Sequence, residues 1–253
     1  MGTSTFVRVR DGQSIFVRTV GKGPPVLLLH GFGLTSLQWL PFIQSYKQLF
    51  SFYIPDFRGA GRSWRCPYNK TNIFQNNMED LQDIVAHFAL EDFPVVGYSM
   101  GASTALQWLK SDGMKGASRY LHVEQGANIR NGKSGQFGLF GRHQGAFMGA
   151  LRTLSPAVNS MSTLGSFFTN LQAWHDSYLE PPDNSAAFDQ CRIPVTFLIG
   201  KHSLLYSSTG QLETAKSVPN ARVVLFENSG HLLPFVEPRK FVRELGRFLS
   251  GDG

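Results

Sequence analysis

Two patterns of apolar residues alternate along this chain. Short continuous apolar runs, such as Val26 to Leu29, are typical of buried strands. Between them lie longer stretches in which apolar residues recur at spacings of three and four, as from Asn72 to Leu90, so that one face of a helix is buried. We therefore predict an α/β fold, a mostly parallel, doubly wound sheet with helices on both faces.

The predicted elements begin with an edge hairpin around Asp11 and Gly12, because alternating segments flank this turn sequence. Later elements alternate between strand and helix: strand 26–29, helix 37–50, strand 51–55, helix 72–90, strand 93–96, helix 102–109, strand 120–124, strand 193–199, helix 211–217, strand 222–226, and a last helix that buries Phe241, Leu245, Phe248 and Leu249.

The alternation stops in one long segment, which carries many glycines and scattered aromatic side chains. A structureless loop of this length is uncommon inside a compact domain. We expect residues 129–188 to be an inserted, mainly helical cap, and residues 1–128 and 189–253 to form the core.

Composition narrows the class of protein. Of the 253 residues, 42% are hydrophobic, which excludes a disordered chain, and no apolar run is long enough to span a membrane. The two cysteines, Cys66 and Cys191, lie far apart without the spacing of a metal site. They predict free thiols and a cytoplasmic location, with a single disulfide as the alternative.

The net charge of +6 raises the question of a nucleic-acid partner. The basic residues are scattered, however, and form no continuous stripe with interleaved aromatic residues. We expect a solvated basic surface and no nucleic-acid partner; the oligomeric state is not predicted.

One pentapeptide lies at the junction of a predicted strand and a predicted helix, Gly97-Tyr98-Ser99-Met100-Gly101. A strand that turns into a helix this quickly crowds its corner residue, and glycines on both sides leave room for the backbone. The hydroxyl of Ser99 then projects above the sheet, where the helix start favours negative charge. The pattern predicts a nucleophile elbow; the alternative is a structural serine in a glycine-rich corner.

A serine hydroxyl needs a neighbouring base to act as a nucleophile. His231 follows the last predicted strand, at the sheet edge where Ser99 lies, and the glycine before it lets the imidazole reach inward. The loop from His30 to Gly33 offers backbone N–H groups beside the nucleophile. We assign the two oxyanion donors to Phe32 and Met100, with a purely structural glycine turn as the alternative for this loop.

These motifs resemble the α/β-hydrolase superfamily, and the likeness covers nearly all of the chain except the cap. The matching residues occur in the family's order: His30-Gly31, the turn from Asp56 to Ser63, the elbow from Gly97 to Gly101, Gly230-His231, and Glu237-Pro238 with Phe241. The short glycine loops and the place of the cap resemble the branch of serine esterases, lactonases and haloperoxidase-like enzymes. This resemblance implies an α/β-hydrolase fold with a cap, a serine nucleophile, and no cofactor or metal.

The third member of the expected catalytic triad departs from the family pattern. Most members carry an aspartate in the turn after the strand predicted at 193–199, whereas this chain has Ser203. Glu124 ends the preceding strand, the place from which some family lipases supply their acid, and it is our candidate. Glu227 is a second candidate. A chain without a catalytic carboxylate, or a substitution at Ser203, fits the same pattern.

The sequence therefore predicts a serine hydrolase that cleaves a small carboxylic ester, thioester or lactone through an acyl-enzyme, with Ser99, His231 and Glu124 as the triad. Aromatic residues of the cap favour an apolar substrate group, and we place Phe140, Phe147 and Trp174 in its pocket. Perhydrolysis by the same groups stays open. The alternative of another class is a binding or sensor protein with little or no turnover, which Ser203 favours.

Overall fold

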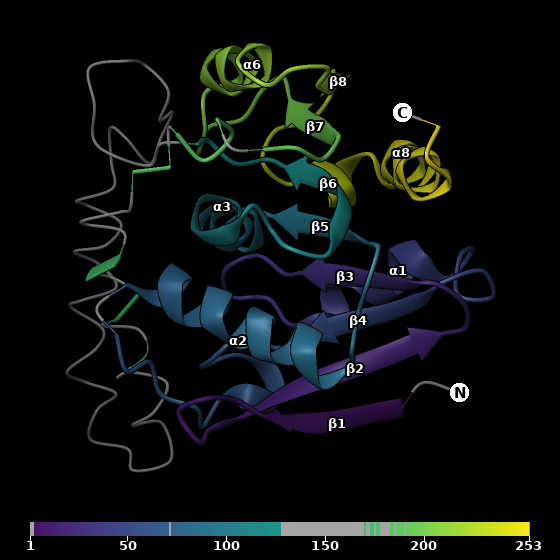
Figure 1. Ribbon diagram of the computed structural model, residues 1–253. Coiled ribbons are helices and arrows are strands. Elements are labelled where there is room, and N and C mark those ends of the chain that lie inside the picture. The colour runs from purple at the N-terminus through teal and green to yellow at the C-terminus, as the bar shows by residue number, and fades with distance from the viewer. Residues whose placement is uncertain are drawn as a thin grey trace.

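A computed structural model describes residues 3–70, 72–127, 170, 173–174, 176–177, 183–184, 186–189 and 191–252. Within these residues, eight strands form one sheet in the order β1-β2-β4-β3-β5-β6-β7-β8 (Figure 1). The strands are β1 (Thr3–Arg8), β2 (Ser14–Gly21), β3 (Pro25–Leu29), β4 (Ser51–Pro55), β5 (Phe93–Tyr98), β6 (Ala117–Val123), β7 (Val195–Gly200) and β8 (Arg222–Phe226).

Pairing in the sheet is antiparallel at one edge and parallel in the rest. β2 runs antiparallel to both β1 and β4, and all pairs from β4 through β8 are parallel. Gly12 takes a positive φ of 84° in the turn between β1 and β2. The predicted edge hairpin and the mostly parallel sheet are therefore confirmed, and the parallel strands bring their carboxyl ends to one edge.

Helices cover both faces of the sheet. The helical elements are η1 (Ser36–Trp39), α1 (Leu40–Ile43), η2 (Gly61–Ser63), α2 (Ile73–His87), α3 (Met100–Asp112), α6 (Ser208–Lys216), α7 (Leu233–Val236) and α8 (Pro238–Ser250). Leu27 and Val95 point into the apolar cluster under α2 and α3, whereas their neighbours Leu28 and Val96 point into the cluster under α1 and α8. Adjacent strand residues thus serve opposite faces, as a doubly wound sheet requires.

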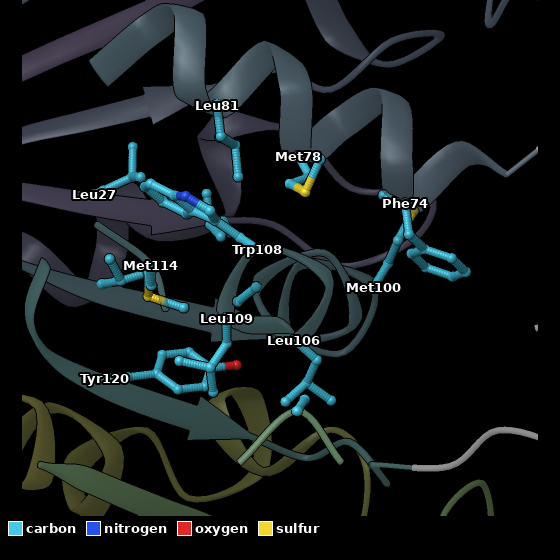
Figure 2. Packing of buried hydrophobic residues seen from close by; sticks show 14 of the residues in the cluster. Leu27, Phe74, Met78, Leu81, Met100, Leu106, Trp108, Leu109, Met114 and Tyr120 are labelled. Atoms are coloured by element: carbon cyan, nitrogen blue, oxygen red, sulfur yellow. The ribbon is translucent and has the colours of Figure 1, made fainter. Parts of the chain in front are cut away.

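The larger core lies between the sheet and the pair α2 and α3. Figure 2 shows Trp108 of α3 among Leu81 of α2, Leu27 of β3 and Tyr120 of β6, all of which belong to one buried cluster. The indole also stacks on the ring of Phe93, with 6.2 Å between the ring centroids. This packing anchors α3, and with it the residue that precedes its first turn.

The helix predicted over residues 37–50 is wrong. The structure has only the short helices η1 and α1 there, followed by consecutive turns over residues 44–49. Pro41 explains the break between η1 and α1, because proline has no N–H to donate and is tolerated only in the first turn of a helix. It lies at the start of α1, so one long helix through this position is not formed.

The predictions for the last helix, the cap, the cysteines and membrane-spanning segments have different outcomes. The last helix buries Phe241, Leu245 and Phe248 as predicted. The predicted cap at 129–188 falls mostly outside the described residues, so the division into core and cap stays a prediction. Both cysteines are buried and free, as expected from their spacing. None of the described helices combines the length and the apolar character that crossing a membrane requires.

Candidate active site

Ser99 occupies a tight corner between β5 and α3. Its φ of 53° and ψ of −117° lie in a region that residues other than glycine rarely adopt. A β-carbon on Gly97 would lie 2.9 Å from the Cα of Ala102, and one on Gly101 would lie 2.4 Å from the carbonyl oxygen of Leu29. Only glycine fits at both positions, so the sequence Gly-x-Ser-x-Gly forms the nucleophile elbow that it predicts.

His231 and Ser99 are in hydrogen-bond contact. The Nε2 atom of His231 lies 2.9 Å from the Oγ atom of Ser99. His231 belongs to the loop between β8 and α7, at the carboxyl edge of the parallel strands. For Ser99 to donate its proton, Nε2 must be unprotonated, and the ring hydrogen must then sit on Nδ1.

Glu124 faces the other nitrogen of the same imidazole. Its Oε2 atom lies 3.3 Å from Nδ1 of His231, and its side chain is fully buried. The Oε1 atom accepts hydrogen bonds from the backbone N–H of Gly200 at 2.5 Å and from Nε2 of Gln211 at 3.3 Å. These donors give the buried oxygen its hydrogen-bond partners, and they fix the orientation of the carboxyl group toward Nδ1.

Ser203 and Glu227 do not occupy the position beside Nδ1. The hydroxyl of Ser203 accepts a hydrogen bond from the backbone N–H of Tyr206 at 3.3 Å. Glu227 is half exposed and pairs with Lys201 at 2.7 Å. The sequence singles out three positions for the acid, Glu124, Ser203 and Glu227. Of these, Glu124 is the one within hydrogen-bond distance of the imidazole.

The two proposed oxyanion donors lie on segments that flank the elbow. Met100 is the first residue of α3, so no carbonyl of an earlier helical turn is available to its N–H. Phe32 follows β3, the strand beside β5. The loop before it is held close to the elbow, because a β-carbon on Gly31 would lie 2.8 Å from the ring of Tyr98.

Of the predicted pocket residues, Phe140 and Phe147 lie outside the described residues. Trp174 is described and buried, and its ring meets that of Phe32 edge-on, with 4.7 Å between the centroids. Its Nε1 atom donates to the hydroxyl of Tyr68 at 3.3 Å. The structure thus brings one predicted pocket residue onto the proposed oxyanion loop.

Sequence reasoning missed two tyrosines that hold His231. Tyr98 stacks on the imidazole with 5.4 Å between centroids and an interplanar angle of 29°, and its hydroxyl donates to the His231 carbonyl at 2.9 Å. Tyr206 packs against the imidazole at a centroid distance of 5.4 Å. The sequence could have indicated Tyr98, because this residue adjoins Ser99 in the pentapeptide. No local sequence pattern marks Tyr206.

Replacing Tyr98 by Phe should lower kcat about 5- to 10-fold and leave KM unchanged, because the ring stays while the hydrogen bond that holds the histidine loop is lost. Steady-state kinetics on an aryl ester measure this. Tyr46→Phe is the matched control, since the Tyr46 hydroxyl also donates to a backbone carbonyl, that of Val242, at 2.8 Å. Both variants should lose similar thermal stability, but an equal loss of kcat in both would contradict a positioning role for Tyr98.

A second buried histidine supports the loop that carries Glu124. His122 lies in β6, and its Nε2 donates to the carbonyl of Gln125 at 2.7 Å, because a carbonyl can only accept. Its Nδ1 then accepts from the hydroxyl of Tyr120 at 2.8 Å. Burial lowers the pKa of His122 to about 4, so the ring is neutral in the folded protein over most of the pH range.

This histidine predicts a pH dependence of stability. The unfolded chain binds a proton at His122 below about pH 6.5, whereas the folded chain does so only below about pH 4. The unfolded state holds the extra proton in that window, so the contribution of His122 to stability falls by about 3 kcal/mol as pH is lowered through it. Buried His30 adds a contribution of the same sign, and Asp80, whose pKa burial raises to about 6, adds one of the opposite sign. The difference in unfolding free energy between the parent and His122→Gln, measured in urea across pH, should therefore show the slope of His122. His87→Gln, on the surface of α2, should leave the slope intact; an unchanged slope in His122→Gln would contradict the account.

The fold and the Ser99, His231 and Glu124 cluster define the class of α/β hydrolases with a serine at the elbow. A model described as the alpha/beta hydrolase family matches residues 26–244. The chain belongs to this family.

Named relatives cover almost the whole chain. An uncharacterised carboxylesterase of Bacillus subtilis is 22% identical and covers 98% of this chain and 87% of its own length. The pimeloyl-[acyl-carrier protein] methyl ester esterase of Nitrosomonas europaea is 23% identical over 90% of this chain and 97% of its own. An esterase structure from Rhodococcus superimposes with a TM-score of 0.78 at 20% identity, covering 99% of both chains.

Proposed function

We propose that this protein is a serine hydrolase that cleaves a carboxylic ester through an acyl-enzyme intermediate. The observation that carries the proposal is the 2.9 Å contact between Ser99 Oγ and His231 Nε2. The esterase names of several relatives support the same reaction class. Ester hydrolysis by this route needs a nucleophile, a base and two backbone N–H donors for the oxyanion.

In the first half of the proposed reaction, Ser99 Oγ attacks the ester carbonyl while its proton passes to His231 Nε2. Glu124 holds the imidazole in the correct tautomer and stabilises the imidazolium that forms. We assign the backbone N–H groups of Phe32 and Met100 to the oxyanion of the tetrahedral intermediate. The intermediate collapses when His231 returns the proton to the leaving alkoxide, which departs as the alcohol and leaves the acyl group on Ser99.

In the second half, His231 takes a proton from water, and the resulting hydroxide attacks the acyl carbonyl. The same donors hold the second oxyanion, and the proton returns to the Ser99 oxygen as the carboxylic acid is released. The aromatic pair Phe32 and Trp174 supports an ester with an apolar group, because the Trp174 ring packs on Phe32, which belongs to the proposed oxyanion loop.

The alternative of a binding protein without turnover rests on Ser203. The position of Glu124 beside the imidazole weakens that reading, since the chain has a buried carboxylate where the triad needs one. No observation on the described residues favours the alternative over the enzyme.

A partitioning experiment tests the acyl-enzyme without depending on which step limits the rate. Ethyl, phenyl and p-nitrophenyl butyrate share one acyl group but differ in the alcohol that leaves. With methanol added, a common acyl-enzyme must give the same ratio of methyl butyrate to butyric acid from all three esters. Ratios that differ with the leaving alcohol would contradict the intermediate, and no turnover of any ester in the panel would favour the binding protein.

A further inference from the structure

A pocket lies at the antiparallel edge of the sheet, away from the elbow. It has a volume of about 620 Å³ and is formed by Phe6, the hairpin tip at residues 12–14, and residues 61–62 and 64–66, which follow β4. Strands β4 and β3 lie between the hairpin and β5, which carries the elbow. The volume is in the range of small-molecule sites, so the pocket is large enough for a ligand of its own.

Two arginines that line this pocket lie over aromatic rings and not beside carboxylates. The guanidinium of Arg62 lies 4.6 Å from the ring centroid of Phe16 and 5.5 Å from that of Phe6. The guanidinium of Arg65 lies 4.7 Å from the ring centroid of Trp64. Among the residues that the structure describes, neither guanidinium has a carboxylate oxygen within 4.0 Å.

The neighbouring arginines show the contrast. Arg10 pairs with Asp83 at 2.8 Å, and Arg58 pairs with Asp80 at 2.7 Å. A guanidinium that stacks its face on a ring keeps its N–H edge available, and this edge has the geometry to bind a phosphate or carboxylate with two hydrogen bonds. The two pocket arginines are thus oriented by apolar contacts that leave their donors for a ligand.

The acidic side chains nearest to the pocket are occupied elsewhere. Asp11, beside the hairpin tip, accepts from Arg58 at 2.6 Å and from Asn69 at 2.7 Å. Asp56 is buried and accepts from the backbone N–H groups of Ser36 and Arg62 at 2.6 and 2.8 Å. The carboxylates are therefore balanced by their own donors, and the charge that the pocket offers to a ligand is positive.

Two exposed rings complete the site. Phe6 and Trp64 are 49% and 36% exposed. Large aromatic side chains left in contact with water next to unpaired cations suit a ligand that has both a flat apolar part and an anionic group.

We propose that this pocket binds a small aromatic anion, namely a phosphate monoester on a flat ring, between the Arg62 and Arg65 guanidinium groups and the Phe6 and Trp64 side chains. A phosphate dianion matches two forked donors better than a carboxylate does. Binding at this pocket is separate from ester cleavage at Ser99, so either can exist without the other.

Calorimetric titration with phenyl phosphate tests the site on the full chain. We expect saturable binding to the parent protein, weakened about tenfold in Arg62→Gln and in Arg65→Gln, because each variant removes one charged donor pair. Arg239→Gln is the charge-matched control, since Arg239 is exposed on α8, far from the hairpin. Thermal unfolding of the variants checks that each is folded.

Further ligands separate the parts of the proposal. Benzoate should bind more weakly than phenyl phosphate, because it lacks the second negative charge of the phosphate. Phenol, which lacks the anion, and inorganic phosphate, which lacks the ring, should each bind more weakly still. Absence of saturable binding to the parent, or equal affinity in the parent, Arg62→Gln and Arg65→Gln, would overturn the proposal. Equal affinity for inorganic phosphate and phenyl phosphate would overturn the aromatic part of it.

Discussion

Glu124→Gln is expected to lower kcat/KM for an aryl ester about 10³- to 10⁴-fold. Glutamine has nearly the same size as glutamate but carries no charge to stabilise the imidazolium of His231. Its amide can also present N–H donors to Nδ1, which favours the tautomer that cannot take the proton of Ser99. Because Oε1 is held by the N–H of Gly200 at 2.5 Å, the substituted side chain has little freedom to adjust.

Glu227→Gln is the matched control for this variant. Glu227 lies in the loop that leads to His231, but its carboxylate pairs with Lys201 at the surface. We expect Glu227→Gln to keep the activity of the parent within about twofold, because exposed ion pairs contribute little. Activity that survives Glu124→Gln but is lost in Glu227→Gln would contradict the assignment of the acid and would move it to Glu227.

Ser99→Ala is expected to lower kcat by about 10⁵- to 10⁶-fold, to the level that binding and the oxyanion donors alone provide. Stopped assays at high enzyme concentration are needed to measure the remainder. Alanine is the smallest residue that keeps a β-carbon, so the elbow should stay intact in this variant.

The control for Ser99→Ala is Ser217→Ala, at the end of α6, where the hydroxyl is exposed and donates to the carbonyl of Thr214. It should keep full activity. Thermal unfolding of Ser99→Ala should occur close to that of the parent, because no donor or acceptor other than His231 is paired with the Ser99 hydroxyl among the described residues. Turnover in Ser99→Ala within tenfold of the parent would contradict a covalent role for this serine.

Much of the scaffold was predictable because its signals are local. The apolar runs of the strands, the period of α2 and α8, and the glycines around Ser99 each report a structure formed by a few neighbouring residues. The meeting of Ser99, His231 and Glu124 was also predictable, since parallel strands present their carboxyl ends at one edge of the sheet.

The remaining features depend on contacts between distant segments, which no periodic pattern reveals. Gln211 reaches Glu124 from a helix 87 positions further along the chain. Tyr206 packs on His231 because Ser203 anchors its N–H, a contact without a sequence signature. The error at residues 37–50 has a different cause, because Pro41 prevents one continuous helix from running through this segment.

Mass spectrometry after reaction with a fluorophosphonate tests the central claim most directly, that His231 activates Ser99 as a nucleophile. The reagent should attach once per chain, and digestion should place the adduct on Ser99. His231→Ala should slow labelling by at least about 10³-fold, whereas His202→Ala should not slow it. An adduct on another residue, or labelling of Ser99 at the same rate without the imidazole of His231, would contradict the mechanism.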